Sequence, residues 1–112
     1  MTKKVTDSRA IRAEVSELIA CLHLMSKGFA VFRNMIPKGP IDFVAIHMET
    51  KEVHFIDSKT VVRKEHKARR RHTPEQEELR VVFAYLSPDE AQEMLEDYHI
   101  NFVNEKGEDI EF

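Results

Sequence analysis

Two apolar runs joined by a short polar turn occupy the middle of the sequence. They cover residues 41–47 (Ile-Asp-Phe-Val-Ala-Ile-His) and the start of residues 53–59 (Val-His-Phe-Ile-Asp-Ser-Lys). Runs of this length, rich in branched and aromatic residues, are typical of strands. The polar residues between them predict an antiparallel hairpin, and the other elements are placed around it.

The hairpin carries two acids and a lysine. Strand side chains alternate between faces, so Asp57 and Lys59 share one face and Ser58 lies on the other. A turn near residues 49–50 sets Asp42 opposite Asp57. A turn one residue later sets Asp42 opposite Lys59. Both registers leave the two acids and the lysine on one face, because they differ by two positions.

These residue types suit phosphodiester hydrolysis. The carboxylates of Asp42 and Asp57, with the backbone carbonyl of Ser58, are hard oxygen ligands of the kind that Mg²⁺ or Mn²⁺ prefers. Beside such a metal, Lys59 would orient the attacking water and offset charge on the phosphate. We therefore expect a Mg²⁺ or Mn²⁺ site and no organic cofactor.

Further elements are predicted on both sides of the hairpin. A helix from about residue 9 to residue 27 ends at Gly28. Its apolar residues follow a 4-3-4-3 spacing, which predicts a buried stripe made of Ile11, Val15, Leu18, Leu22 and Met25. The remaining predictions are a strand at 29–33, a proline-initiated helix from Thr73-Pro74, a strand at 80–86, a helix at 87–98 and a hairpin of 100–103 with 109–112. Residues 80–86 also fit a continuation of the helix before them.

Composition favours a single domain that works inside the cell. The 112 residues are 42% hydrophobic and 33% charged, and no apolar run reaches the ~18 residues of a membrane span. The Met-Thr-Lys-Lys start lacks the apolar core of a signal peptide. A single cysteine, Cys21, excludes an internal disulfide. We expect one α/β domain over residues 1–112 (core 8–86, C-terminal helix and acidic hairpin 87–112), cytoplasmic and without membrane contact.

Charge is divided unequally along the chain. Residues 1–74 hold 15 Lys/Arg against 8 Asp/Glu (+7), whereas residues 75–112 hold 2 against 12 (−10). The densest cationic segment follows Lys59 closely, where it is positioned to hold phosphates beside a scissile bond. We therefore expect DNA, branched or duplex, as the partner. The candidate DNA contacts are Arg33, Lys38, Arg63, Lys64, Lys67, Arg69, Arg70 and Arg71.

The ordered set of motifs resembles the PD-(D/E)xK nuclease superfamily, in particular archaeal-type Holliday-junction resolvases and small phage or homing endonucleases. The shared pattern is a helix acid, the stretch 27–33 (Lys-Gly-Phe-Ala-Val-Phe-Arg), an acid-bearing strand and an acid-x-Lys strand end. The resemblance implies a restriction-endonuclease-like αβββαβ core, with a mixed central sheet flanked by helices. It also implies a Mg²⁺-dependent endodeoxyribonuclease in recombination, repair or phage DNA processing.

The resemblance assigns roles to two further residues. The spacing to Gly28 selects Glu17 over Glu14 as the helix acid that completes the metal shell, and the apolar neighbours of Glu17 favour the same choice. Gln76 matches the glutamine that many of these nucleases carry after the lysine motif. The implied catalytic set is Glu17, Asp42, Asp57, Lys59 and Gln76.

Some features depart from the resolvase pattern. Residues 34–41 contain no serine, and Asp57 stands where resolvases usually have glutamate, so specificity for four-way junctions stays open. A homodimer is expected, because cutting both strands of a duplex needs two active sites. Two alternatives are a catalytically silent DNA-binding relative and a nonenzymatic protein whose acidic tail binds a basic partner.

Overall fold

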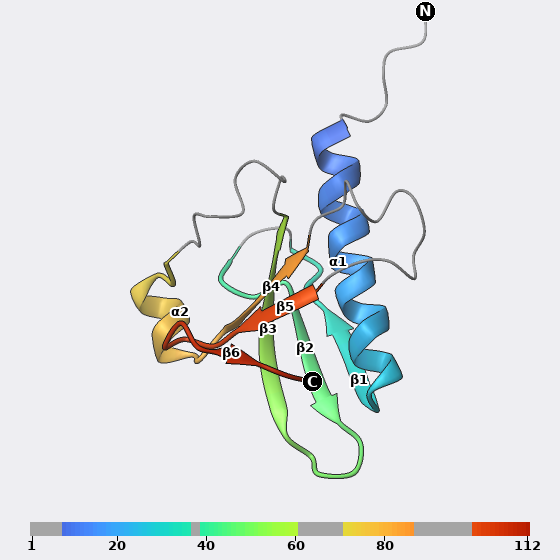
Figure 1. Ribbon diagram of the computed structural model, residues 1–112, viewed down its shortest axis with the longest axis vertical. Helices are drawn as coiled ribbons and strands as arrows, with labels where there is room; N and C mark the ends of the chain where they lie inside the picture. The colour runs from blue at the N-terminus through green and yellow to red at the C-terminus, as the bar shows by residue number, and fades with distance from the viewer. Residues whose placement is uncertain (1–7, 37–38, 61–70, 87–99) are drawn as a thin grey trace, which may run out of the picture.

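A mixed sheet of six strands forms the centre of the structure (Figure 1). The computed structural model describes residues 8–36, 39–60, 71–86 and 100–112. The elements in chain order are helix α1 (Ser8–Ser26), strands β1 (Phe29–Arg33), β2 (Phe43–His47) and β3 (Val53–Thr60), helix α2 (Pro74–Glu78), and strands β4 (Val82–Leu86), β5 (Ile100–Val103) and β6 (Asp109–Ile110). The predicted α/β class is confirmed.

The strands lie in the sheet in the order in which they occur in the chain. Neighbouring strands are antiparallel except β3 and β4, which are parallel. A parallel pair needs a crossover connection, and α2 belongs to that connection. The predicted terminal hairpin is confirmed as β5 and β6, whereas the helix predicted at 87–98 lies outside the described residues.

The register of the β2–β3 hairpin decides between the two alignments of the acids. Phe43 pairs with Ile56, and Ala45 pairs with His54. One step further along the ladder, Asp42 lies beside Asp57, as the turn near residues 49–50 requires. The first of the two predicted registers is therefore confirmed.

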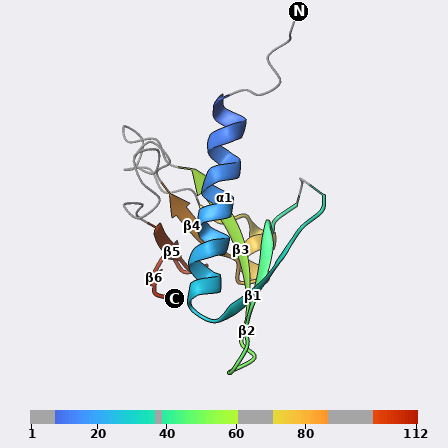
Figure 2. The ribbon, with the colours of Figure 1, turned by 90° about the vertical axis from the view of Figure 1, so that its right-hand side faces the viewer.

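Strand β3 divides its side chains between two environments. Ile56 and Thr60 face α1, where the Thr60 hydroxyl donates to Ser16 Oγ at 3.1 Å. Asp57 faces the opposite side, where it accepts a hydrogen bond from Gln76 of α2. The two helices thus contact opposite faces of the sheet, and Figure 2 shows α1 lying across the strands.

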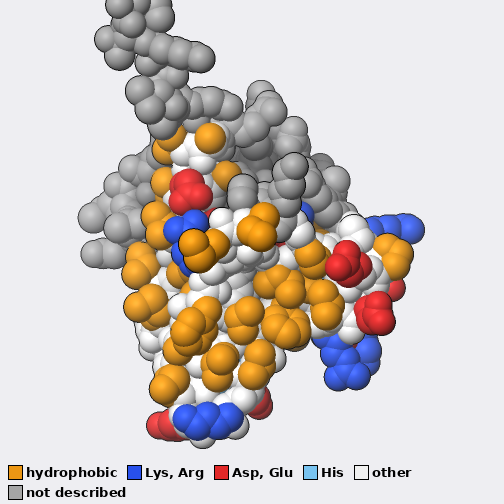
Figure 3. All heavy atoms as spheres, turned by 180° about the vertical axis from the view of Figure 1, so that it is seen from behind, with side chains coloured by type: hydrophobic (Ala, Val, Ile, Leu, Met, Phe, Trp, Pro, Cys, Tyr) orange, Lys and Arg blue, Asp and Glu red, His pale blue; other side chains and the backbone are white. Residues whose placement is uncertain are grey.

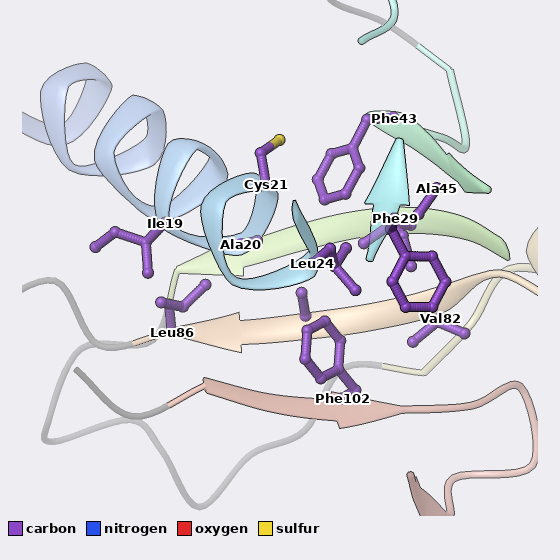
Figure 4. Close-up of a cluster of buried hydrophobic side chains, with 12 residues drawn as sticks. Ile19, Ala20, Cys21, Leu24, Phe29, Phe43, Ala45, Val82, Leu86 and Phe102 are labelled. Carbon is purple, nitrogen blue, oxygen red and sulfur yellow. The ribbon is translucent and has the colours of Figure 1, made fainter. Parts of the chain in front are cut away.

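The hydrophobic core lies between α1 and the sheet (Figure 4). Helix α1 contributes four residues to it, namely Ile19, Ala20, Cys21 and Leu24. The predicted buried stripe is therefore wrong. Only Val15 of that stripe is partly buried, and the other four residues are 46% to 56% exposed: Ile11, Leu18, Leu22 and Met25.

The stripe prediction failed because α1 is apolar on two faces. The face toward the sheet includes the small residues Ser16 and Ala20, each with no exposed surface. Small side chains let the helix backbone approach the strands closely, but they carry little weight in a hydrophobicity pattern. The larger apolar residues of the opposite face dominated the hydrophobicity pattern, so the pattern predicted that this face, and not the one with Ser16 and Ala20, packs against the sheet.

Helix α2 is short because both of its ends are fixed locally. Thr73 accepts from the backbone N–H of Gln76, and the Gln76 side chain accepts from the backbone N–H of Thr73, so the predicted start is a complete capping box. Arg80 has a φ of 56°, which ends the helical path before β4. Residues 82–86 are therefore a strand and not a continuation of the helix. Among the described residues, no helix is long and apolar enough to cross a membrane.

The orientation of α1 is tested by the same substitution on its two faces. Ala20→Leu should lower the free energy of unfolding by about 1–3 kcal/mol or more, because a larger side chain has no space against the sheet. Ala13→Leu, at an exposed position of the same helix, should change it by less than ~0.5 kcal/mol. Urea denaturation measures both, and equal effects would contradict the observed orientation.

Candidate active site

Two carboxylates meet where strands β2 and β3 run side by side. Asp42 comes just before β2, and its backbone N–H donates to the Ile56 carbonyl at 2.8 Å. Its Oδ2 accepts the backbone N–H of Ser58 at 2.7 Å. This bond turns the Asp42 side chain toward Asp57, and the two carboxyl groups share a hydrogen bond. The backbone of the hairpin thus holds the acids together.

Lys59 and Gln76 complete the cluster around Asp57. Lys59 Nζ lies 3.0 Å from Asp57 Oδ2, and Gln76 Nε2 donates to the same oxygen at 2.9 Å. The Gln76 amide also donates to the Pro40 carbonyl at 3.2 Å. The structure therefore brings four predicted site residues into one network.

Gln76 is held rigidly because both ends of its amide are engaged. Its Oε1 accepts from Thr73 N–H at 3.0 Å in the capping box, while its Nε2 donates to Asp57 and Pro40. The residue is only 6% exposed. An amide fixed in this way can present only a donor to Asp57, so it holds that carboxylate oxygen in place.

Burial raises the pKa of Asp42 to about 7, with the hydrogen bond and charge of Asp57 as the next causes. The Ser58 N–H acts in the opposite sense, and the charge of Glu17 adds a small further rise. The raised pKa makes Asp42 easier to protonate near neutral pH than an ordinary aspartate. Carboxylates with strongly raised pKa values occur most often at functional sites.

The base of the site contains aromatic groups that the sequence analysis missed. Lys59 Nζ lies 5.0 Å above the centre of the Phe83 ring, a cation–π arrangement. The His72 ring stacks on Phe83 at 3.8 Å between centres, and His72 Nε2 lies 2.6 Å from the Val81 carbonyl. Phe83 pairs with Asp57 across the β3–β4 ladder, so its side chain lies on the same face of the sheet. The alternation of side chains along the predicted strand 80–86 was the sequence signal that could have identified it.

The two helix acids differ in exposure. The Glu17 side chain is 17% exposed and the Glu14 side chain 61%. Arg33 contacts both, with Nε 3.1 Å from Glu17 and a terminal nitrogen 3.2 Å from Glu14. Glu17 thus lies nearer the acidic pair and influences Asp42, but its carboxylate is directed to Arg33.

The donor set fits a hard cation with a partly hydrated shell. Within the described segments, no group of three His, Cys, Asp or Glu side chains is arranged to hold a metal. Mg²⁺ commonly needs only one or two carboxylates, since waters and substrate phosphates supply the rest. Each carboxylate has about four lone-pair sites, so Asp42 and Asp57 keep acceptors beyond their observed hydrogen bonds. The Ser58 carbonyl and Glu17, through water, remain the predicted further ligands.

Most of the predicted DNA contacts lie outside the described residues: Lys38, Arg63, Lys64, Lys67, Arg69 and Arg70. Arg71 is described and exposed. Arg33 is 45% exposed at its side chain but already pairs with two acids. Its observed contacts are with Glu14 and Glu17 of α1. Burial also raises the pKa of the Cys21 thiol to about 11, which disfavours a thiolate nucleophile there.

No known protein family, curated protein or solved structure matches this chain.

The acidic pair makes a prediction about stability and pH. Asp42 is protonated more readily in the folded state than in the unfolded chain, where its pKa is 3.8. The fold is therefore weakened as pH rises from about 4 through 7, because ionisation of Asp42 is disfavoured there. Asp42→Asn should raise the melting temperature of the metal-free protein by a few degrees at pH 8, and the gain should disappear near pH 4.

Calorimetry at several pH values checks this expectation. Glu49→Gln, at an exposed position of the β2–β3 turn, is the matched control and should show no such pH-dependent gain. A gain for Asp42→Asn that is the same at pH 4 and pH 8 would exclude ionisation as its cause.

Proposed function

We propose that this chain is a Mg²⁺- or Mn²⁺-dependent DNA endonuclease of the PD-(D/E)xK superfamily. The element order α1, β1, β2, β3, α2, β4 agrees with the αβββαβ core that this class implies. Strands β5 and β6 extend the sheet beyond that core. The proposed activity is hydrolysis of phosphodiester bonds in branched or duplex DNA, with weak or no reading of bases.

The observation that carries the proposal is the network of Asp42, Asp57, Lys59 and Gln76. Two carboxylates in contact repel each other when both are ionised, and burial increases that cost. A purely structural cluster would be more stable with one acid replaced by a neutral group. A bound divalent cation removes the repulsion, so the pair is favourable in a protein that binds such an ion.

Each residue has a part that follows from its position. Asp42 and Asp57 would hold the metal, with the Ser58 carbonyl and, through water, Glu17. When bound, the metal stabilises charge on the phosphate and lowers the pKa of a water molecule. Lys59 holds its ammonium group against Asp57, where it would orient the attacking water and face a phosphate oxygen. Gln76 fixes the Asp57 carboxylate in place.

One observation favours a second candidate, a catalytically silent DNA-binding relative. Arg33 pairs with both helix acids, so Glu17 is not free to act directly on a metal in the described arrangement. In that case the chain would bind DNA through its cationic residues without cutting it. Metal-dependent nicking distinguishes this candidate from the endonuclease.

The experiment that tests the function is cleavage of labelled duplex, flap, single-stranded and four-way DNA with Mg²⁺ or Mn²⁺. The unaltered protein should nick at least one substrate, and Asp57→Asn should lower the rate by roughly 100-fold or more because a metal ligand loses its charge. Lys59→Ala should lose turnover with little change in DNA affinity, since its contribution is made in the transition state.

Glu49→Gln serves as the control and should retain full activity. Circular dichroism verifies that each variant is folded. Binding of DNA by the unaltered protein without metal-dependent cleavage would support the silent relative and exclude the endonuclease.

The two helix acids give a separate prediction. Glu17→Gln should reduce cleavage at least ~10-fold more than Glu14→Gln, because Glu17 is the acid whose charge reaches Asp42. The two substitutions are chemically identical, lie one turn apart on α1 and affect the same arginine. Initial rates at saturating Mg²⁺ provide the comparison. Greater sensitivity at Glu14 would shift the helix acid by one turn.

A further inference from the structure

The ammonium group of Lys59 has two contacts of different kinds. Its Nζ lies 3.0 Å from Asp57 Oδ2 and 5.0 Å from the centre of the Phe83 ring. The lysine side chain is 21% exposed, so both contacts are largely shielded from water. The stem of a lysine is flexible, and a single contact does not fix where its charge lies. The Phe83 ring therefore adds a second point of attachment beside the acidic pair.

Only one of these two contacts is open to competition from a metal ion. A divalent cation bound by Asp57 would draw on the same carboxylate that Lys59 uses. The face of a phenylalanine ring, in contrast, is not a ligand for a hard cation such as Mg²⁺, which takes oxygen donors. The contact with Phe83 is therefore the one that keeps Lys59 beside the site when Asp57 is engaged.

The Phe83 ring is buried, unlike many apolar side chains of this protein. Hydrophobic side chains gather at the surface above the charged tip of the β2–β3 turn (Figure 3). Phe32 of β1 is 57% exposed, whereas Phe83 is 1% exposed. The attraction between a cation and an aromatic ring is stronger when the pair is shielded from water. Phe83 therefore attracts an ammonium group more strongly than an exposed ring would.

Neighbouring aromatic residues fix the orientation of the Phe83 ring. The His72 ring stacks on it with 3.8 Å between centres and 4° between planes, and His72 Nε2 lies 2.6 Å from the Val81 carbonyl. Tyr85 makes an edge-to-face contact with Phe83, with 6.0 Å between centres and 79° between planes. The face of an aromatic ring is the negative side of its quadrupole. A ring held in this way keeps a favourable surface for the Lys59 ammonium in one place.

We propose that Phe83 is a positioning residue for Lys59: its ring holds the ammonium group at the site, also when Asp57 is engaged by a divalent cation. The catalytic consequence rests on the proposed function, whereas the contact itself belongs to the metal-free protein. A ring that only filled space would matter through its size and not through the charge distribution over its face. The electronic character of the ring thus distinguishes positioning from packing.

Fluorinated phenylalanines with one, two or three ring fluorines provide the test, because they change the size of the ring little and progressively remove the negative charge of its face. At position 83 they should lower kcat in steps, by roughly tenfold for the trifluorinated ring, with KM for DNA unchanged. The same analogues at position 43 are the matched control, since Phe43 is also buried but belongs to the core cluster with α1. They should leave kcat unchanged.

A second measurement needs no cleavage. In nuclear magnetic resonance spectra of the metal-free protein, the ring current of Phe83 should shift the ε-methylene protons of Lys59 upfield relative to those of the exposed Lys27. The shift should persist when Mg²⁺ is added. It should be lost in Phe83→Leu, which keeps an apolar side chain without a ring, and circular dichroism verifies that this variant is folded.

The two measurements separate this inference from the proposed function. Cleavage that is insensitive to fluorine at position 83, an equal loss at position 43, or a Lys59 shift that is absent or disappears with Mg²⁺ would overturn the inference and leave the nuclease function standing. A protein that shows the Lys59 shift and cleaves no DNA would overturn the proposed function, and with it the catalytic role of Phe83.

Discussion

The alternation of side chains along β3 determines both the core and the candidate site. Ile56 and Thr60 turn toward α1 and fix the helix on one face of the sheet. Asp57 and Lys59 turn toward α2 and meet Asp42 and Gln76 on the other face. A register shift of one residue would exchange the two sets, burying a charged pair in the apolar core. The packing of the core therefore protects the geometry of the acidic network.

The sequence predicted the strands, and the grouping of Asp42, Asp57 and Lys59 on one face, because both depend on local rules. Period-two alternation and the turn at 49–50 determined which side chains of the hairpin share a face. The capping signal at Thr73 predicted where α2 begins, and the capping box then holds the Gln76 side chain beside Asp57. The stacking of His72 on Phe83 could not be predicted from local sequence patterns, because that contact depends on how the connection between β3 and β4 returns to the sheet.

The orientation of α1 could not be predicted from its pattern alone. Hydrophobic periodicity finds an apolar row, but it cannot tell which of two rows a sheet will cover. The face with the small residues Ser16 and Ala20 packs against the sheet, because small side chains let the helix backbone lie closer to the strands than Leu18 and Leu22 would. Ala20 adds little to a hydrophobicity pattern, yet it has no exposed surface.

Arg33 of β1 pairs with Glu17 of α1 and offsets the negative charge of that acid near Asp42. Asp42, Asp57 and Glu17 would together place three negative charges near one point, and only Lys59 and Arg33 oppose them in the described contacts. With Glu17 paired to Arg33, the remaining acids share a proton at neutral pH, which leaves the metal-free protein folded without a full charge on each acid. A divalent cation would displace that proton and restore both charges as ligands. The raised pKa of Asp42 and the ion pair of Glu17 thus both limit the repulsion among these acids in the described structure.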